Sequence, residues 1–269
     1  MESRSNSAIR LDALQRFLMV NALSGILPLY VVTEYPKSGG SWLSQMISEY
    51  MDVPFPRNQR PAMTSSVMHG HMLYLPTMSN VICLFRDGRD VMVSLYYHVL
   101  FENERNSHEL VRATRAELAF ENAEDIKRNL VKFMDYIYRK EFASLSPFKF
   151  TWDRFARSWI NRVVIKVRYE DLVVDCFERM KLLLGDLTGN SVDEGRLREI
   201  VHKYSFESQT QRKSGQEDIR SFIRKGEPGD WREKFSGEAA ANFNDKYGRE
   251  LIALGYEFDE SWVESYGGE

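Results

Sequence analysis

The chain has 269 residues, 43% of them hydrophobic, so it can bury one sizeable core, and we expect a single domain over residues 1–269. A formal net charge of -3 and a sequence pI near 6.0 argue against a nucleic-acid binder and leave small anionic ligands as candidates. The two cysteines, Cys83 and Cys176, suggest neither a disulfide framework nor a metal-ligand cluster, so a reduced, cytoplasmic setting is expected.

The first apolar stretch of the chain is "FLMVNALSGILPLYVV". It is short and is interrupted by Asn21, Gly25 and Pro28, so no membrane span is predicted. Residues 11–24 are interpreted as an amphipathic helix that leads into the core, with a signal peptide as the alternative.

Three apolar runs rich in β-branched and aromatic residues are predicted to be core strands: 29–35, 80–86 and 162–169. Each precedes a segment with apolar residues three and four positions apart, which predicts three helices: 41–51, 90–101 and 176–187. Strands that alternate with helices pair in parallel through right-handed crossovers. The expected fold is therefore α/β, a three-layer sandwich with a central, mostly parallel sheet.

Two segments depart from this alternation. Residues 101–160 are charged and favour helices without a strand candidate, which indicates a helical insertion beside the sheet. Residues 207–229 are polar and contain glycine, which predicts a long loop, and long loops in compact domains usually serve a function.

The first predicted strand continues into a loop and a helix, "YVVTEYPKSGGSWL". Gly39 and Gly40 allow the backbone to approach an anion, and Ser38 and Ser41 add hydroxyl donors. Amide groups that open the next helix would complete the cradle, and Lys37 adds a mobile positive charge. The lysine precedes the glycines, unlike the usual phosphate loop, and a plain turn before a helix is the alternative.

The second predicted strand ends in "FRDGRDVMVSLYYH". Arg86 can present its guanidinium to a phosphate, and Ser94 can add a hydroxyl from the following helix. The alternative is an ion pair between Arg86 and Asp90 that only closes the turn.

A third basic motif, "SFIRKGEPGDWREKF", lies at the end of the long loop. Arg224, Lys225 and Gly226 form a candidate anion clamp, and a solvated charge run is the alternative. Asp230 is predicted to cap a helix that begins at Trp231.

The three motifs together resemble the sulfotransferases that use 3'-phosphoadenosine 5'-phosphosulfate, PAPS, and the first motif resembles their P-loop-like phosphosulfate-binding loop. The resemblance implies that the 5' end of the nucleotide is bound by Lys37, Ser38, Gly39, Gly40 and Ser41. It implies that the 3'-phosphate is bound by Arg86, Ser94, Arg224, Lys225 and Gly226. Trp42 would stack on the adenine, and the segments "VRYEDL" and "KYSFE" place Tyr169, Tyr204 and Phe206 beside the nucleotide.

The sequence departs from this family's pattern at two places. Gly40 stands where the family more often has threonine, which removes a hydroxyl donor from the loop. The dimerisation motif of many cytosolic members is not recognisable in "SGEAAANFNDKYG", so the oligomeric state stays open.

Sulfuryl transfer moves a neutral SO3 unit from a phosphate to an acceptor hydroxyl or amine, so no metal is expected. Charge builds on the departing phosphate, where Lys37 can stabilise it. The acceptor must lose a proton, and "SSVMHGHMLYLP" carries two candidate bases, His69 and His71, whose imidazoles suit neutral pH. Spacing to Pro76 favours His69, whereas the family's Lys-x-His pattern favours His71, which we choose. The alternative is a pair of surface histidines on a loop; His98 is expected to be structural.

A nucleotide kinase is the main rival function, but it should show the Gly-Lys-Ser/Thr order and a magnesium site. A non-catalytic nucleotide-binding protein is the rival from another class. The expected acceptor is a small molecule, a glycan or a lipid, and the 101–160 insertion is expected to shape the acceptor site. Six apolar residues could line that site, although most are expected in the core: Met68, Met72, Tyr74, Tyr96, Tyr97 and Phe101.

Overall fold

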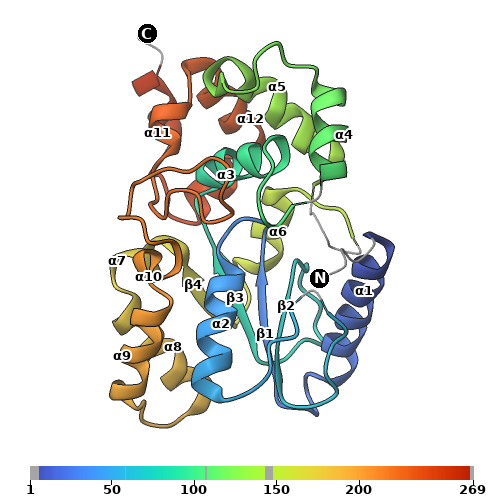
Figure 1. Cartoon of the computed structure of the whole chain (residues 1–269), viewed down its shortest axis with the longest axis vertical. Coiled ribbons are helices and arrows are strands. Elements are labelled where there is room, and N and C mark those ends of the chain that lie inside the picture. The colour runs from blue at the N-terminus through green and yellow to red at the C-terminus, as the bar shows by residue number, and fades with distance from the viewer. Residues whose placement is uncertain (1–5, 58, 107, 143–147, 267–269) are drawn as a thin grey trace.

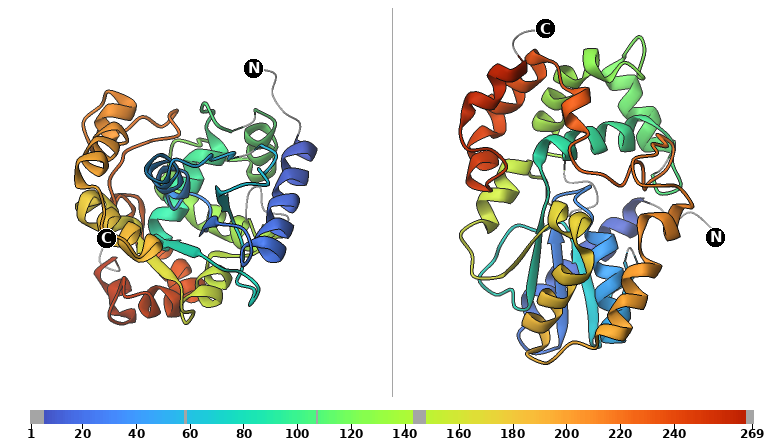
Figure 2. Two further views of the ribbon diagram at one scale, coloured as in Figure 1. Left: turned by 90° about the horizontal axis from the view of Figure 1, so that it is seen from below. Right: turned by 90° about the vertical axis from the view of Figure 1, so that its left-hand side faces the viewer.

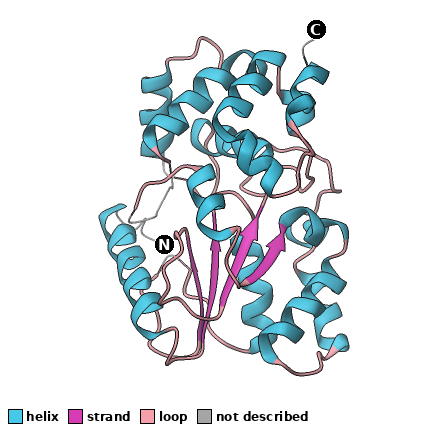
Figure 3. Ribbon diagram, turned by 180° about the vertical axis from the view of Figure 1, so that it is seen from behind, coloured by secondary structure: helices cyan, strands magenta, loops and turns pink. Residues whose placement is uncertain are grey.

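The computed structural model describes residues 6–266 except 58, 107 and 143–147. Its described residues form four strands in one parallel sheet of order β2-β1-β3-β4. The strands are β1 (Leu29–Glu34), β2 (Ser66–Gly70), β3 (Val81–Phe85) and β4 (Ile165–Arg168). All four arrows point toward the helical half of the molecule (Figure 3), so the loops that follow the strands meet at one edge of the sheet.

The sequence predicted β1, β3 and β4 within a few residues but missed β2. The β2 segment, "SVMHG", has a histidine and a glycine and lacks the β-branched run that marks a strand. It becomes a strand because its backbone pairs in register with β1, with Val32 opposite His69. The histidines predicted to precede the second core strand therefore lie in β2 and just after it.

The helices of the described residues are α1 (Asn6–Leu23), α2 (Gly40–Met51), α3 (Gly88–Leu100), α4 (His108–Leu118), α5 (Ile126–Lys140), α6 (Trp152–Trp159), α7 (Tyr169–Val174), α8 (Cys176–Thr188), α9 (Glu194–Lys203), α10 (Phe206–Thr210), α11 (Trp231–Lys234) and α12 (Gly237–Ala253), and a 3-10 turn, η1 (Glu260–Tyr266), follows them. The three helices expected after strands are α2, α3 and α8. The N-terminal helix is α1. None of the described helices has both the length and the apolar character needed to cross a bilayer.

Helices cover both faces of the sheet, as the three-layer prediction requires. The left panel of Figure 2 shows the strands between α1 in blue and the α8–α9 pair in gold and orange. Neighbouring residues of a strand enter opposite layers: Val32 and Ile82 join the buried cluster under α2 and α8, whereas Val31 and Cys83 join the larger cluster on the other face. This alternation follows from the two-residue period of a strand.

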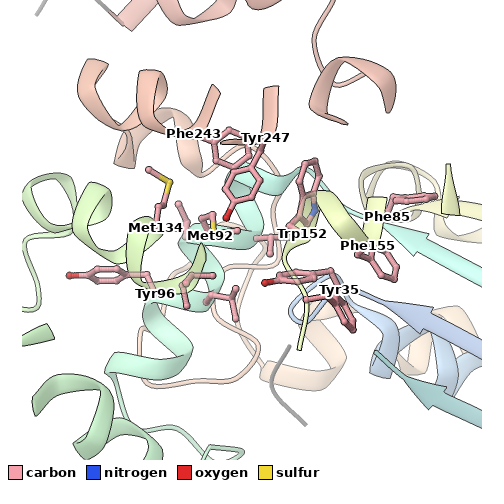
Figure 4. Packing of buried hydrophobic residues seen from close by; sticks show 14 of the residues in the cluster. Tyr35, Phe85, Met92, Tyr96, Met134, Trp152, Phe155, Phe243 and Tyr247 are labelled. Carbon is pink, nitrogen blue, oxygen red and sulfur yellow. The ribbon is translucent and has the colours of Figure 1, made fainter. Parts of the chain in front are cut away.

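The larger cluster joins the sheet to the helical half of the molecule. Figure 4 shows Tyr35, at the end of β1, close to the α6 residues Trp152 and Phe155, with Phe243 and Tyr247 of α12 beyond them. The rings of Phe243 and Tyr247 lie 4.9 Å apart, and Trp152 contacts both of them. Most of the apolar residues considered for an acceptor pocket belong to this core: Met68, Met72, Tyr96, Tyr97 and Phe101 are buried, and Tyr74 packs against them.

The 101–160 segment is helical as predicted and forms α4, α5 and α6. Of these, α4 and α5 lie in the helical half with α3 and α12, on the far side of the molecule from the lower end of the sheet (Figure 1). The predicted loop at 207–229 begins instead inside the short helix α10 and then runs without a helix or strand to Asp230.

Candidate active site

A cavity of about 420 Å³ lies at the carboxyl edge of the sheet. Every residue predicted to bind the nucleotide lines it except Ser38: Lys37, Gly39, Gly40, Ser41, Trp42, Arg86, Ser94, Tyr169, Tyr204, Phe206, Arg224, Lys225 and Gly226. Ser38 is buried, with its backbone amide bonded to the Tyr35 carbonyl. The three sequence motifs, whose predicted binding residues extend from Lys37 to Gly226, therefore face one space.

The first loop holds an unusual backbone shape. Lys37 and Gly39 have φ values of 74° and 101°, in the left-handed region, which a lysine adopts only where its surroundings enforce it. The Lys37 carbonyl accepts a hydrogen bond from Arg86 Nη1 at 2.9 Å. A Cβ on Gly39 would lie 2.8 Å from the Tyr169 ring, so glycine is required there. The second motif thus holds the first loop in place.

Gly40 is required for a reason that the sequence did not reveal. Its amide donates a hydrogen bond to Glu34 Oε2 at 2.5 Å, and Glu34 Oε1 lies 3.1 Å from His69 Nε2. A Cβ on Gly40 would come within 2.6 Å of Glu34 Cδ and 2.7 Å of His69 Nε2. The Glu34–His69 pair therefore fills the space beside residue 40, and one amide predicted for the anion cradle is bonded to a carboxylate instead.

Glu34 is a buried ionisable residue that the prediction overlooked, although an acid at the end of an apolar strand was a visible signal. Burial opposes its ionisation, but the hydrogen bond from His69 and the nearby His71 and Gly40 hold the pKa of Glu34 below its ordinary value. The Glu34 carboxylate, at the end of β1, stays ionised despite its burial because these groups lie beside it.

The two candidate bases differ in their environment. His69 is 8% exposed within β2, so the alternative of two surface histidines on a loop is wrong. His71 Nδ1 lies 3.1 Å from the Glu34 carbonyl oxygen. A carbonyl can only accept, so Nδ1 carries the hydrogen and the lone pair of the neutral ring is on Nε2. Neither histidine lines the cavity described above, whereas Glu34, which contacts both, does.

Burial, and after it the charge of His69, lowers the pKa of His71 to about 4. His71 is therefore neutral at pH 7, as a base must be, although its pKa lies below the range expected for imidazole from sequence. The two imidazole rings lie 5.5 Å apart, edge to face.

Glu34, His69 and His71 could also hold a metal ion, because one ligand atom from each lies within 4.8 Å of the others. The hydrogen bonds among these groups and Gly40 already satisfy the carboxylate without an ion. The residues therefore form a hydrogen-bonded unit in their own right.

The Asp90 carboxylate has hydrogen-bond partners besides the Arg86 ion pair that was considered from sequence. Its carboxylate lies 4.0 Å from Arg86 Nη2, at the outer limit of an ion pair. The same carboxylate accepts hydrogen bonds from the amides of Gly229 and Trp231, at 2.6 and 3.1 Å. Asp90 thus ties the clamp segment to the start of α3.

The clamp cations already have acidic partners. Asp230 lies 2.5 Å from Arg224 and 2.7 Å from Lys225, and Arg224 also pairs with Glu217. Burial opposes the ionisation of Asp230, but Arg224 and Lys225 hold its pKa below the ordinary value. The predicted capping role is wrong: Asp230 makes no side-chain cap to α11, because its oxygens bind the clamp cations.

Aromatic residues form the other wall of the cavity. Trp42 Nε1 donates to the Tyr204 carbonyl at 2.8 Å, and the Trp42 ring lies 6.1 Å from that of Tyr169. Gly226, with φ of 74°, leaves room for Phe206, whose Cδ2 would lie 2.2 Å from an added Cβ. The clamp and the predicted adenine side therefore touch through Phe206.

Lys37 has a partner that the sequence did not indicate. Its Nζ lies 3.7 Å from the centre of the Phe222 ring, and Phe222 comes from the loop that carries the clamp. Burial, and after it the charge of Arg86, lowers the pKa of Lys37 to about 7. The aromatic residue in "SFIRKG" was the available signal for this contact.

Comparisons with known proteins identify the family. The family described as "Sulfotransferase domain" matches residues 57–255, an interval that begins after the first loop. Cytosolic sulfotransferase 12 of Arabidopsis thaliana is 25% identical over 247 residues, covering 78% of this chain and 73% of that protein.

Two solved structures share the fold. Mouse sulfotransferase SULT7A1, complexed with PAP, superimposes with a TM-score of 0.63 at 15% identity and covers 94% of each chain. Retinol dehydratase, complexed with retinol and PAP, superimposes with a TM-score of 0.56 at 17% identity and covers 90% of this chain and 86% of that one. With the family match over most of its length, this chain belongs to the sulfotransferase family.

Proposed function

We propose that this protein transfers a sulfuryl group from PAPS to a hydroxyl or amine of an acceptor and releases adenosine 3',5'-bisphosphate. The observation that carries the proposal is the convergence of the three anion motifs on one cavity in a member of this family. The order of Lys37 before the glycines also disfavours a kinase.

In this proposal the cavity holds the nucleotide from two sides. Lys37 and the backbone around Gly39 and Ser41 bind the 5' end, while Arg86, Ser94 and the clamp bind the 3'-phosphate. Arg224 and Lys225 are paired with Asp230, so an incoming phosphate joins an existing network. Trp42, Tyr169, Tyr204 and Phe206 face the adenine. Ser38 supports the loop from beneath.

The transfer step needs one base and one group that receives charge. The acceptor O–H proton passes to Nε2 of His71 while the acceptor oxygen bonds to sulfur. The bond from sulfur to the bridging oxygen breaks, and its electron pair stays on the 5'-phosphate, where Lys37 stabilises it. The Glu34 carbonyl orients His71, and His69 holds the Glu34 carboxylate. No metal is required in this scheme.

We place the protein in the cytoplasm, as the name of its Arabidopsis relative suggests for that protein. We infer a single domain over 1–269, since the larger buried cluster contains residues from Val20 to Trp262. Within the 101–160 insertion, Arg105 lines the cavity, so this segment can influence the acceptor there.

Two measurements test the proposal. Titration calorimetry with adenosine 3',5'-bisphosphate should show binding without magnesium, and ATP with magnesium should bind more weakly. Transfer of labelled sulfate from PAPS to an acceptor panel should then give a labelled product. Tight bisphosphate binding without any transfer would identify a non-catalytic nucleotide-binding protein, and a preference for ATP with magnesium would favour the kinase.

A further inference from the structure

Phe222 gathers three cations that come from three different parts of the chain. The ring centre lies 3.7 Å from Lys37 Nζ, 4.5 Å from Arg105 Cζ and 5.9 Å from Arg57 Cζ. Arg105 and Phe222 both line the cavity. Arg57 lies in the loop between α2 and β2, and Arg105 in the loop between α3 and α4, so neither belongs to the three donor motifs.

Few negative charges lie close to these three cations. Within the described part of the chain, no carboxylate makes an ion pair with Lys37, Arg57 or Arg105 at 4.0 Å or less. The two acids nearby offset only part of this charge and bind other groups: Glu34 binds Gly40 and His69, and Glu104 binds the Phe222 amide at 3.0 Å. Burial, and after it Arg105, lowers the pKa of Arg57 to about 10.

The position of Arg57 relates this charge to the acceptor side. Phe55, two residues before it, packs edge-on against His69 with ring centres 6.2 Å apart. The loop of Arg57 therefore lies beside the histidines, where an acceptor must approach to lose its proton. Lys37, which belongs to the first donor motif, connects the two sides, since its Nζ lies over the Phe222 ring and its carbonyl accepts a hydrogen bond from Arg86.

We propose that Arg57 and Arg105 form an anion subsite for the acceptor, so that the enzyme prefers a hydroxyl or amine on a molecule that also carries a carboxylate, phosphate or sulfate group. This inference rests on the proposed function. An acidic acceptor would relieve the repulsion among the three cations, and an arginine fork bonds such oxyanions in pairs. A neutral phenol or sterol would leave both guanidinium groups without an anionic partner.

Matched acceptors test the preference. With labelled PAPS, we would compare 4-hydroxybenzoate with 4-hydroxybenzamide, and phenyl glucuronide with phenyl glucoside. The third pair is a peptide that carries a tyrosine O-sulfate and a second, free hydroxyl, compared with the same peptide without the sulfate. The charged member of at least one pair should have a kcat/KM about tenfold or more above its neutral partner, as expected for charged hydrogen bonds. The pair that responds distinguishes carboxylate from sulfate recognition.

Variants assign the preference to the two arginines. Each of two variants, Arg57→Gln and Arg105→Gln, should lower the ratio of kcat/KM for the charged acceptor to kcat/KM for the neutral one about tenfold. Each should change the bisphosphate Kd by less than about twofold, and Arg105 is at an exposed position. Arg112→Gln, which removes one charge from an exposed site on α4, should change neither. If the arginine variants weaken bisphosphate binding as much as acceptor use, the two residues serve the donor and the proposal is wrong.

The remaining outcomes also decide the question. Equal or better use of the neutral members overturns the anion subsite but leaves the sulfotransferase function standing. Should no pair be sulfated, melting of the bisphosphate-loaded protein with 4-hydroxybenzoate and with its amide gives a second readout, and equal stabilisation by both counts against the subsite. Failure of the wild type to bind the bisphosphate would instead sink the proposed function.

Discussion

The Glu34 carboxylate accepts a hydrogen bond from the amide of Gly40, the first residue of α2. The same carboxylate meets His69 from the neighbouring strand, and an added Cβ at residue 40 would overlap both groups. Residue 40 is thus coupled to residue 34, because the acid and the histidine fill the space that a larger side chain at residue 40 would occupy.

Gly40→Ala should destabilise the protein by about 1–3 kcal/mol, as expected for overpacking at a rigid contact. Gly185→Ala is the matched control, because nothing lies within 4 Å of a Cβ there and alanine favours a helix. Adding Glu34→Thr to Gly40→Ala should recover part of the loss. Denaturant unfolding of the wild type, the single variants Gly40→Ala and Glu34→Thr, and the double variant measures this coupling, and additive effects would contradict it.

Arg86→Ala should weaken binding of adenosine 3',5'-bisphosphate by roughly 1.5–3 kcal/mol and binding of adenosine 5'-phosphate by much less. The reason is the loss of a charged contact to the 3'-phosphate. Arg249→Ala, an exposed arginine on α12, is the control. Calorimetry measures the binding of both nucleotides. Equal weakening of the two would mean that Arg86 acts only by holding the Lys37 carbonyl.

Bisphosphate binding at pH 8 should take up about one proton, through Lys37, whose pKa is lowered to about 7 by burial and by Arg86. Free Lys37 is largely neutral at that pH, and a bound anion favours its charged form. Calorimetry in buffers of different ionisation enthalpy measures the uptake, which Lys37→Arg should abolish. The affinity for the bisphosphate should fall as the pH rises above 7. Proton uptake that persists in Lys37→Arg would exclude Lys37 as its source.

The pKa of Lys37 also affects stability. Between about pH 7 and the unfolded lysine value near 10.5, the unfolded chain binds a proton that the folded protein does not. The free energy of unfolding should therefore contain a contribution that rises with pH across this window. Denaturation at several pH values should show that Lys37→Met removes this contribution, and an unchanged pH profile would place the lysine in solvent.

His71→Ala should abolish transfer while leaving bisphosphate affinity within about twofold, since other residues are proposed to hold the nucleotide. His69→Ala should have a milder effect on transfer. Because burial lowers the pKa of His71 to about 4, kcat/KM should persist below pH 6 and fall only as the pH approaches 4. An acidic limb near pH 6.5 would contradict the lowered pKa of His71, and an inactive His69→Ala beside an active His71→Ala would point to His69 as the base.

A chelator should leave both transfer and bisphosphate binding unchanged, because the proposed mechanism meets the phosphate charges with lysine and arginine. Glu34, His69 and His71 make this worth measuring, since their ligand atoms lie within 4.8 Å of one another. Loss of transfer on chelation that zinc restores would show that the three residues hold a metal.

Local sequence patterns predicted the parallel α/β fold and the three motifs that line the cavity. Strand periodicity and the glycine and arginine motifs can each be recognised within a short segment of sequence. Parallel strands then bring the loops that follow them to one edge of the sheet. Trp42 and Tyr169 were assigned to the nucleotide only through the resemblance of their segments to the sulfotransferase family, and both line the cavity.

Only the tertiary structure decided the partners of these residues. Glu34 meets His69 35 positions along the chain, and Asp90 meets the amide of Gly229 139 positions along. Phe222 collects cations from three loops in the same way. No local pattern encodes such pairs, because a side chain's pKa and hydrogen bonds depend on which distant groups share its buried space, and folding alone brings those groups together.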